Sequence, residues 1–100
     1  MEVKELQQIS NDFLNLLHEK YNCDHNSNNT VLHLSEEVGE IAREINKSNI
    51  RKNESLDINN LKEQIGDVMI LIMRLAQIHD VDIETTIQMK IKKIKKAYRI

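Results

Sequence analysis

The 100-residue sequence has no proline, no tryptophan, two glycines and one cysteine, Cys23. A single cysteine excludes an internal disulfide and a cysteine-based zinc cluster, which fits a reducing compartment. With so few glycines and prolines, a multi-stranded sheet would lack the turn residues that it needs. The longest apolar run, residues 68–73, is far shorter than a membrane span. These absences favour an all-α protein that does not cross a membrane.

Acidic and basic residues nearly balance, at a formal net charge of −2. The chain therefore lacks the strong positive charge that is typical of nucleic-acid binding. Its length suits one domain, expected over residues 1–100, and a domain of this size gains stability from a partner subunit. The first residues contain no apolar stretch resembling a signal peptide, so we expect a soluble, cytoplasmic protein.

The apolar residues recur at intervals of three and four, which is the period of amphipathic helices. A first helix is predicted over residues 3–21, and a polar loop over residues 22–29. Thr30 is the expected N-cap of a second helix. The predicted buried positions are Leu6, Ile9, Phe13, Leu14 and Leu17 in the first helix and Val31, Leu34, Val38, Ile41 and Ile45 in the second.

Residues 46–60 are polar and without a period, so we predict a second, longer loop there, with a turn of helix around Ile50. A third helix is expected from about residue 60 to residue 79, and Asp82 is the expected N-cap of a fourth. The centre of the third helix, residues 68–73, is apolar on every side and needs neighbours all round. We therefore predict a bundle of four helices that forms oligomers through the third; burial within one chain is the alternative.

Acidic residues cluster beside the apolar positions of the second and third helices. On a helical wheel, one edge of the second helix carries His33, Glu37, Glu40 and Glu44. Glu36 points further outward, and Asp67 in the third helix lies one turn from both Glu63 and Gln64. If the two helices pack antiparallel, their acids can meet. Carboxylates 4 Å apart repel by about 4 kcal/mol at an effective dielectric of 20, so such a cluster would shift pKa values or attract a cation.

Oxygen ligands without cysteine favour a hard cation such as Mg²⁺. An ordinary solvated helix face is the alternative, because glutamate is a strong helix former and this spacing is common. Gly39 indicates a close approach between helices beside the acids, since glycine inside a helix costs about 1 kcal/mol relative to alanine. Gly66, next to Asp67, is a second glycine inside a predicted helix and indicates a close approach in the same way.

Three segments resemble the motifs of one known family. Residues 36–42 (EEVGEIA) are similar to the EExxE motif of the MazG-like, all-α nucleoside triphosphate pyrophosphohydrolases. Residues 63–68 (EQIGDV) resemble the second motif of that family, in which ExxD is preceded by another glutamate. Residues 81–84 and 90–98 resemble its closing helix, which carries a lysine and ends in a basic stretch and a tyrosine.

This resemblance implies a Mg²⁺-dependent homodimer or homotetramer, with Mn²⁺ as an alternative ion, that cleaves NTPs or dNTPs to the monophosphate and pyrophosphate. It implies metal binding by Glu37, Glu40, Asp67 and position 64, catalytic roles for Glu36, Glu37 and Glu40, and contacts of Lys90 and Tyr98 with the nucleotide. Glu36 would bind an additional ion or help to orient or deprotonate the attacking water. His33, one turn before these acids, is either a histidine at the edge of the core or a further contact with the substrate.

Position 64 departs from the family motif, because Gln64 stands where relatives have glutamate. A glutamine carbonyl can bind Mg²⁺, but it adds no charge and cannot act as a base. Glu63 is the nearest acid, yet it lies about 100° around the helix. Weaker metal binding, a changed number of ions and reduced activity are all compatible with this change.

Two other functions therefore stand beside (d)NTP pyrophosphohydrolysis. One is phosphoribosyl-ATP pyrophosphohydrolysis, whose enzymes have a related fold and related acidic motifs. The other is a catalytically weak helical module for dimerisation or nucleotide binding, which Gln64 favours. The chain has no glycine-rich phosphate loop, and this excludes a P-loop enzyme.

Overall fold

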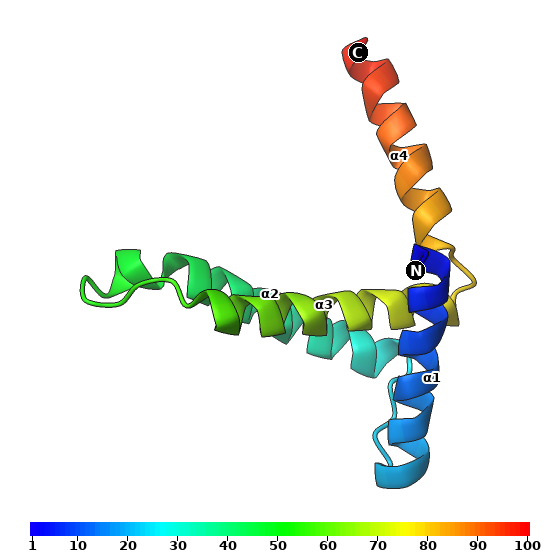
Figure 1. Cartoon of the computed structure of the whole chain (residues 1–100), viewed down its shortest axis with the longest axis horizontal. Helices are drawn as coiled ribbons and strands as arrows, with labels where there is room; N and C mark the ends of the chain where they lie inside the picture. Colours follow the sequence, from blue (N-terminus) through cyan, green and yellow to red (C-terminus); the bar gives the residue numbers. More distant parts are fainter.

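The structure is a computed structural model that describes residues 1–100, and it confirms the predicted all-α fold. Four helices and no strands are present (Figure 1). The helices are α1 (Val3–Tyr21), α2 (Ser27–Ile50), α3 (Ile58–Ile78) and α4 (Ile83–Tyr98). None of them combines the length and the apolar character that crossing a membrane requires.

Side-chain caps explain where the helices begin. α2 starts at Ser27 because the side chain of Asn26 accepts a hydrogen bond from the backbone N–H of Asn29. The prediction of Thr30 as the N-cap is wrong, since Thr30 lies inside the helix and is fully buried. Asp82 caps α4 as predicted, through the N–H of Thr85.

The predicted long loop is also wrong, because α2 continues to Ile50 and leaves only residues 51–57 between the two helices. Asp57 caps α3 by accepting hydrogen bonds from the N–H groups of Asn59 and Asn60. A short loop of this kind forces α3 to turn back along α2.

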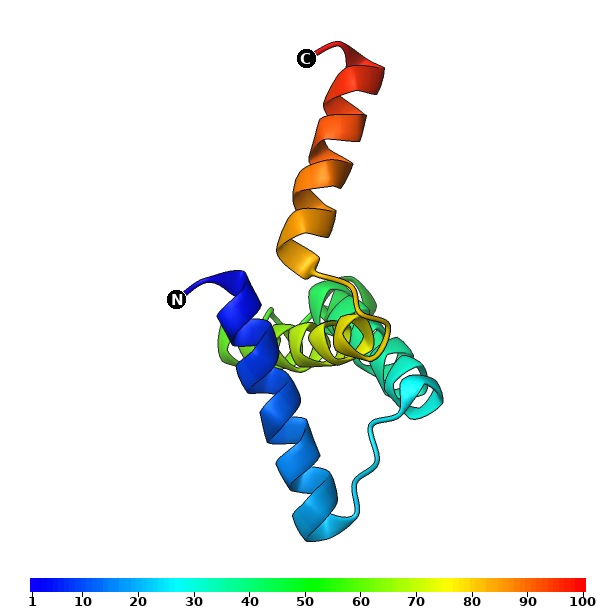
Figure 2. The ribbon, with the colours of Figure 1, turned by 90° about the vertical axis from the view of Figure 1, so that its right-hand side faces the viewer.

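α2 and α3 form an antiparallel hairpin, closed at one end by the 51–57 loop; α1 crosses it near the other, open end, and α4 projects from there (Figures 1 and 2). Hydrogen bonds at both ends of the hairpin fix this pairing. Ser27 at the start of α2 contacts His79 just after α3 at 3.0 Å, and Glu44 near the end of α2 accepts from Asn60 of α3 at 2.7 Å. The antiparallel packing that would allow the acids of the two helices to meet is therefore present.

Carboxylates lie in the seam between α2 and α3. The shielded residues of α2 are Ser27, Thr30, Leu34, Glu37, Ile41, Glu44 and Lys47. α3 repeats the pattern with Leu61, Gln64, Val68, Leu71 and Leu75. The predicted apolar positions Val31, Val38 and Ile45 lie outside the seam, with 44–51% of each exposed. The face that α2 buries against α3 is thus rotated from the apolar stripe, which hydropathy predicts, toward the acidic edge of the helix.

α1 also packs through an unexpected face. Its buried residues are Gln7, Ser10 and Leu14, while the predicted core positions Leu6, Ile9 and Phe13 are 45–50% exposed. The amide of Gln7 explains this rotation, because it donates to the carbonyl of Val81 at 2.9 Å and accepts from the N–H of Ile83 at 3.3 Å. Hydrogen bonding to the α3–α4 connection therefore takes the place of apolar burial.

The apolar core is small for a chain with this many large hydrophobic residues. Only Leu14, Leu71, Met73, Ala76 and Ile83 are buried apolar residues. On α3, one stripe of Ile65, Met69 and Ile72 remains 37–47% exposed, so the chain alone does not surround its most apolar helix. Every residue of α4 after Glu84 is exposed. The exposed stripe on α3 is where the sequence predicts a second subunit.

The predicted close approach at the two glycines is not observed within this chain. A Cβ added to Gly39 or to Gly66 would meet no atom within 4 Å. Neither glycine is therefore required by contacts within one copy of the chain.

Candidate functional site

The acids of α2 and α3 lie close enough for their charges to act on one another. Burial raises the pKa of Glu37, and the negative charges of Glu40 and Asp67 raise that pKa further. His33 acts in the opposite direction, with its Nε2 atom 3.3 Å from a carboxylate oxygen of Glu37. Four of the predicted site residues therefore lie near enough to one another along the hairpin to interact electrostatically.

Gln64 adds an unsatisfied acceptor to this group. It lies in the seam one turn before Asp67, and its Oε1 atom is buried without a hydrogen-bond partner. A buried carbonyl oxygen without a partner is costly and suits a cation or a water molecule. We refer to Glu37, Glu40, Gln64 and Asp67 as the acidic group.

The acidic group fits a hard divalent cation in its chemistry, because it combines three carboxylates with a free amide oxygen. Its side chains are not gathered around one point, since no three His, Cys, Asp or Glu residues are placed to hold an ion together. The ion pair with His33 holds the carboxylate of Glu37. A bound ion would have to compete with this contact.

The remaining predicted residues lie away from the acidic group. Glu36 is exposed on the outer side of α2. Lys90 and Tyr98 are exposed on α4, which packs mainly against α1 and points away from the hairpin (Figure 1). Within one chain, α4 therefore does not bring these two residues to the acids.

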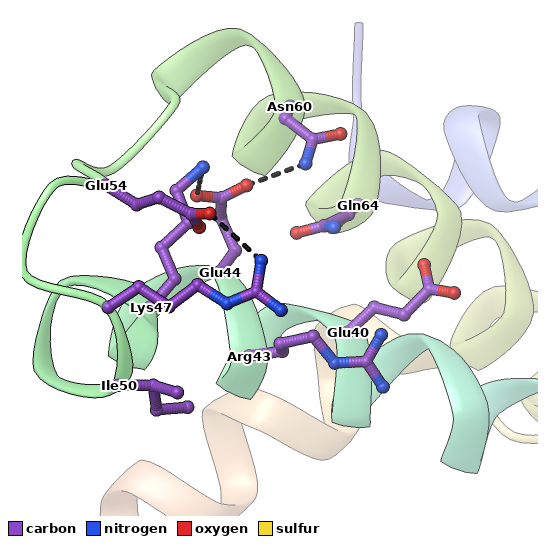
Figure 3. A pocket seen from close by; sticks show the side chains of 9 residues that line it. Glu40, Arg43, Glu44, Lys47, Ile50, Glu54, Asn60 and Gln64 are labelled. Carbon is purple, nitrogen blue, oxygen red and sulfur yellow. Dashed lines mark hydrogen bonds and ion pairs between the residues drawn. The ribbon is translucent and has the colours of Figure 1, made fainter.

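A cavity of about 370 Å³ adjoins the acidic group at the closed end of the hairpin, beside the 51–57 loop (Figure 3). We call it the charged cavity, and it is lined by Glu40, Arg43, Glu44, Lys47, Ile50, Arg51, Glu54, Asn60 and Gln64. Glu40 and Gln64 belong both to this lining and to the acidic group. The acidic group therefore opens directly into a space lined by three basic side chains.

Glu44 holds the wall of the charged cavity together. Its buried carboxylate accepts from the Asn60 amide at 2.7 Å and the Asp57 N–H at 3.1 Å, and it pairs with Lys47 at 2.8 Å. The contact with Lys47 and the two hydrogen bonds lower the pKa of Glu44 to about 2. Glu44 thus fastens α2 to the start of α3.

Glu44→Gln should lower the melting temperature by about 10 °C, because the amide offers donors where Lys47 and the Asp57 N–H also donate. The pKa of Glu44 is depressed, so its contribution to stability is complete above the ordinary value of 4.5 and is lost as the pH falls toward 2. Thermal melts between pH 7 and pH 2 should show this loss in the wild type and not in the variant. Glu54→Gln, which breaks a more exposed ion pair with Arg51, is the control and should shift the melting temperature by at most a few degrees. Equal melting temperatures for Glu44→Gln and the wild type would contradict the anchoring role.

A second, smaller cavity of about 150 Å³ lies where α1 crosses the hairpin. Its lining is mostly apolar and consists of Phe13, Leu14, Leu17, His25, His33, Asp67, Ile70 and Leu71. We call it the apolar cavity. Asp67 lines it, and His33 connects it to Glu37, so the acidic group lies between an apolar and a charged cavity.

The basic residues of the charged cavity, Arg43, Lys47 and Arg51, are not among the residues that the sequence predicts for the site. A signal for Lys47 was present, since His33, Glu37, Glu40, Glu44 and Lys47 follow one another at intervals of four and three, which places them on one face of a helix. The expected loop over residues 46–60 hid the continuation of this face, and the contribution of Arg51 depends on how the short loop folds.

The fold and the acidic group define an all-helical protein with a candidate divalent-cation site between two antiparallel helices. A family model described as the MazG nucleotide pyrophosphohydrolase domain matches residues 25–99, which include α2, α3 and α4. The chain belongs to this family, as the motifs in the sequence predict. Searches of curated proteins and of solved structures found no match.

Proposed function

We propose that the protein is a Mg²⁺-dependent pyrophosphohydrolase that cleaves NTPs or dNTPs to the monophosphate and pyrophosphate. The observation that carries this proposal is the position of the acidic group between the two cavities. A nucleotide also has an apolar end and a charged end, with the reactive phosphoanhydrides on the charged side. The arrangement therefore matches the substrate class of the family.

Glu37, Glu40 and Asp67 would hold the metal, with the Oε1 atom of Gln64 as a neutral fourth ligand. When bound, Mg²⁺ neutralises charge on phosphate oxygens and makes a nearby water more acidic. Glu36, on the outer side of the same turn, would orient or deprotonate the attacking water. The charge of Asp67 already acts on Glu37 before substrate binds, so binding of the ion would relieve a repulsion that the fold maintains.

The decisive experiment incubates the protein with Mg²⁺ and a panel of NTPs, dNTPs and phosphoribosyl-ATP, and measures pyrophosphate release. Turnover of NTPs or dNTPs supports the proposal, and turnover of phosphoribosyl-ATP alone supports the related enzyme of histidine synthesis. Binding without turnover of any panel member supports a nucleotide-binding module. Gln64 favours this last function, because the acidic group has one negative charge fewer than it would have with the glutamate of the family motif.

Gln64→Glu should raise the affinity for Mg²⁺ by about tenfold, because a fourth carboxylate adds charge at a site with an unsatisfied oxygen. Gln64→Leu should lower the affinity, since it removes the amide oxygen and leaves the charge unchanged. Calorimetric titration with Mg²⁺ and with Mn²⁺ measures both. Titrations that do not differ among the three proteins would show that position 64 does not reach the ion.

We further propose that the protein assembles with a second copy of itself. Its accessible surface of 7932 Å² exceeds the about 5,900 Å² expected for a folded monomer of 11.7 kDa. Its radius of gyration is 16.5 Å, where about 13 Å is usual for 100 residues. If each chain buried the excess, a dimer would bury about 4,000 Å² in total, which is typical of permanent homodimers.

The exposed apolar stripes indicate which surfaces a second copy would cover. They are Leu6, Ile9 and Phe13 on α1, Ile65, Met69 and Ile72 on α3, and Ile87, Ile91 and Ile94 on α4. α4 carries five lysines and one glutamate, whereas the exposed charged residues of α2 are Glu36 and Glu40 against Arg43 alone. Packing of α4 against the hairpin of a second copy would match these charges and give Lys90 and Tyr98 a route to the acidic group of that copy.

A further inference from the structure

The charged cavity contains six ionisable side chains, and four of them neutralise each other in pairs. Lys47 pairs with Glu44 at 2.8 Å, and Arg51 pairs with Glu54 at 3.1 Å. The two that remain are Glu40, which belongs to the acidic group, and Arg43. These two lie one turn apart on α2, yet they form no ion pair with each other or with any other residue.

Arg43 is therefore a free guanidinium that lines a cavity (Figure 3). Its side chain takes part in no hydrogen bond or ion pair, and its position is exposed, so the fold does not depend on it. A guanidinium offers five donors in a planar fork that matches two oxygens of a phosphate. The neighbouring pairs add no net charge, and this leaves Arg43 as the available cation for an anionic ligand.

We propose that Arg43 binds the pyrophosphate portion of a nucleotide, so that the phosphates point along α2 toward the 51–57 loop. This inference rests on the proposed function. Glu40, one turn before Arg43, lines the same cavity, so a phosphate chain there lies next to both the acidic group and the guanidinium. Arg43 is then a substrate-binding residue for the leaving group of the reaction.

The apolar cavity disfavours the opposite orientation, with the phosphates toward α1. Five of its eight lining residues are hydrophobic, and its only carboxylate, Asp67, is negative. A phosphate chain in that cavity would lose its hydration beside Asp67 and would find no arginine or lysine there, only His25 and His33, of which His33 already contacts Glu37. The base or the sugar, which carries no charge, is the part of a nucleotide that this cavity can accept.

Binding of inorganic pyrophosphate in the presence of Mg²⁺, measured by isothermal titration calorimetry on the full chain, tests the role of Arg43. Arg43→Gln should weaken binding by about tenfold to a hundredfold, in line with the loss of a charge-assisted bidentate contact. Arg43→Lys should recover part of the affinity, because it keeps the charge but not the fork. Lys20→Gln, an exposed lysine at the end of α1, makes the same change in net charge and should bind like the wild type.

Each outcome separates this inference from the proposed function. If the wild type does not bind pyrophosphate, or if Arg43→Gln binds it as well as the wild type does, the inference is wrong even when nucleotides are turned over. Equal weakening in Lys20→Gln would also contradict it, because net charge alone would then explain the effect. Dependence of pyrophosphate binding on Arg43 without turnover of any nucleotide supports the inference and rejects the hydrolase.

For an active wild type, the kinetic signature is a higher KM in Arg43→Gln together with weaker inhibition by added pyrophosphate. A fall in kcat at unchanged KM and unchanged product inhibition would contradict binding of the leaving group. Circular dichroism of the variants should match the wild type, since Arg43 supports no contact within the fold.

Discussion

Replacing Glu40 with glutamine should reduce pyrophosphate release by at least about a hundredfold, the usual effect of removing a group that stabilises charge in the transition state. The amide keeps the size of the side chain and removes its charge. Glu40 lines the charged cavity and acts electrostatically on Glu37, so it contributes to the acidic group from the side that faces the cavity. Pyrophosphate release at saturating Mg²⁺, with the best nucleotide of the panel, measures the effect.

The same variant has a second readout that does not depend on turnover. Burial is the main reason that the pKa of Glu37 is raised, and the charge of Glu40 is the next. Glu40→Gln should therefore lower the pKa of Glu37 toward its ordinary value, which an NMR titration of the side-chain carboxyl carbon measures. If Glu40→Gln lowered this pKa and retained full activity, Glu40 would belong to the acidic group but would have no role in the reaction.

Glu19→Gln is the matched control, because Glu19 is an exposed acid near the end of α1, outside both cavities. It should change neither the rate nor the pKa of Glu37. If Glu19→Gln slowed turnover as much as Glu40→Gln, the loss of activity would report the net charge of the chain and not a ligand position.

The number, type and order of the helices could be predicted from the sequence, since apolar periodicity depends on local spacing alone. The face that each helix buries could not, and α1 shows why. Hydropathy favours Leu6, Ile9 and Phe13, whereas the chain buries Gln7, which hydrogen-bonds to residues more than 70 positions away. Such long-range polar pairing leaves no periodic signal in the sequence.

Helical spacing in the sequence brings the acids near one another but gives no information on the basic residues beside them. Glu37, Glu40 and Asp67 stand at helical spacing in two helices that pack antiparallel, so one assumption about packing brought them together. The sequence places Glu44 on the acidic edge of the second helix, but its anchoring contacts, and the place of Arg43 in a cavity, depend on the 51–57 loop and on the continuation of α2 to Ile50. Sequence periodicity therefore located the acids, and tertiary structure was needed for the basic side of the cavity.

Introducing a charged residue into the apolar stripe of α4 should have the largest effect on the oligomeric state of the protein. Ile91→Asp places a carboxylate among Ile87, Ile94 and Tyr98, which share one helix face and are 45–74% exposed in a single chain. If a second copy covers this face, the variant would bury an unpaired charge at the interface. We expect analytical ultracentrifugation to show a dimer or larger species for the wild type and a monomer for the variant.

Met89→Asp provides the control for charge and helix propensity. Met89 lies on the same helix, is 67% exposed, and points about 180° away from the Ile87–Ile91 stripe. This variant should keep the assembly of the wild type, and its melting temperature should stay within a few degrees of it. A monomeric wild type at tens of micromolar, or the same assembly in both variants, would show that the stripe is not an interface. In the expected case Ile91→Asp also loses activity while its acidic group is intact, because Lys90 and Tyr98 then have no partner copy whose site they can complete.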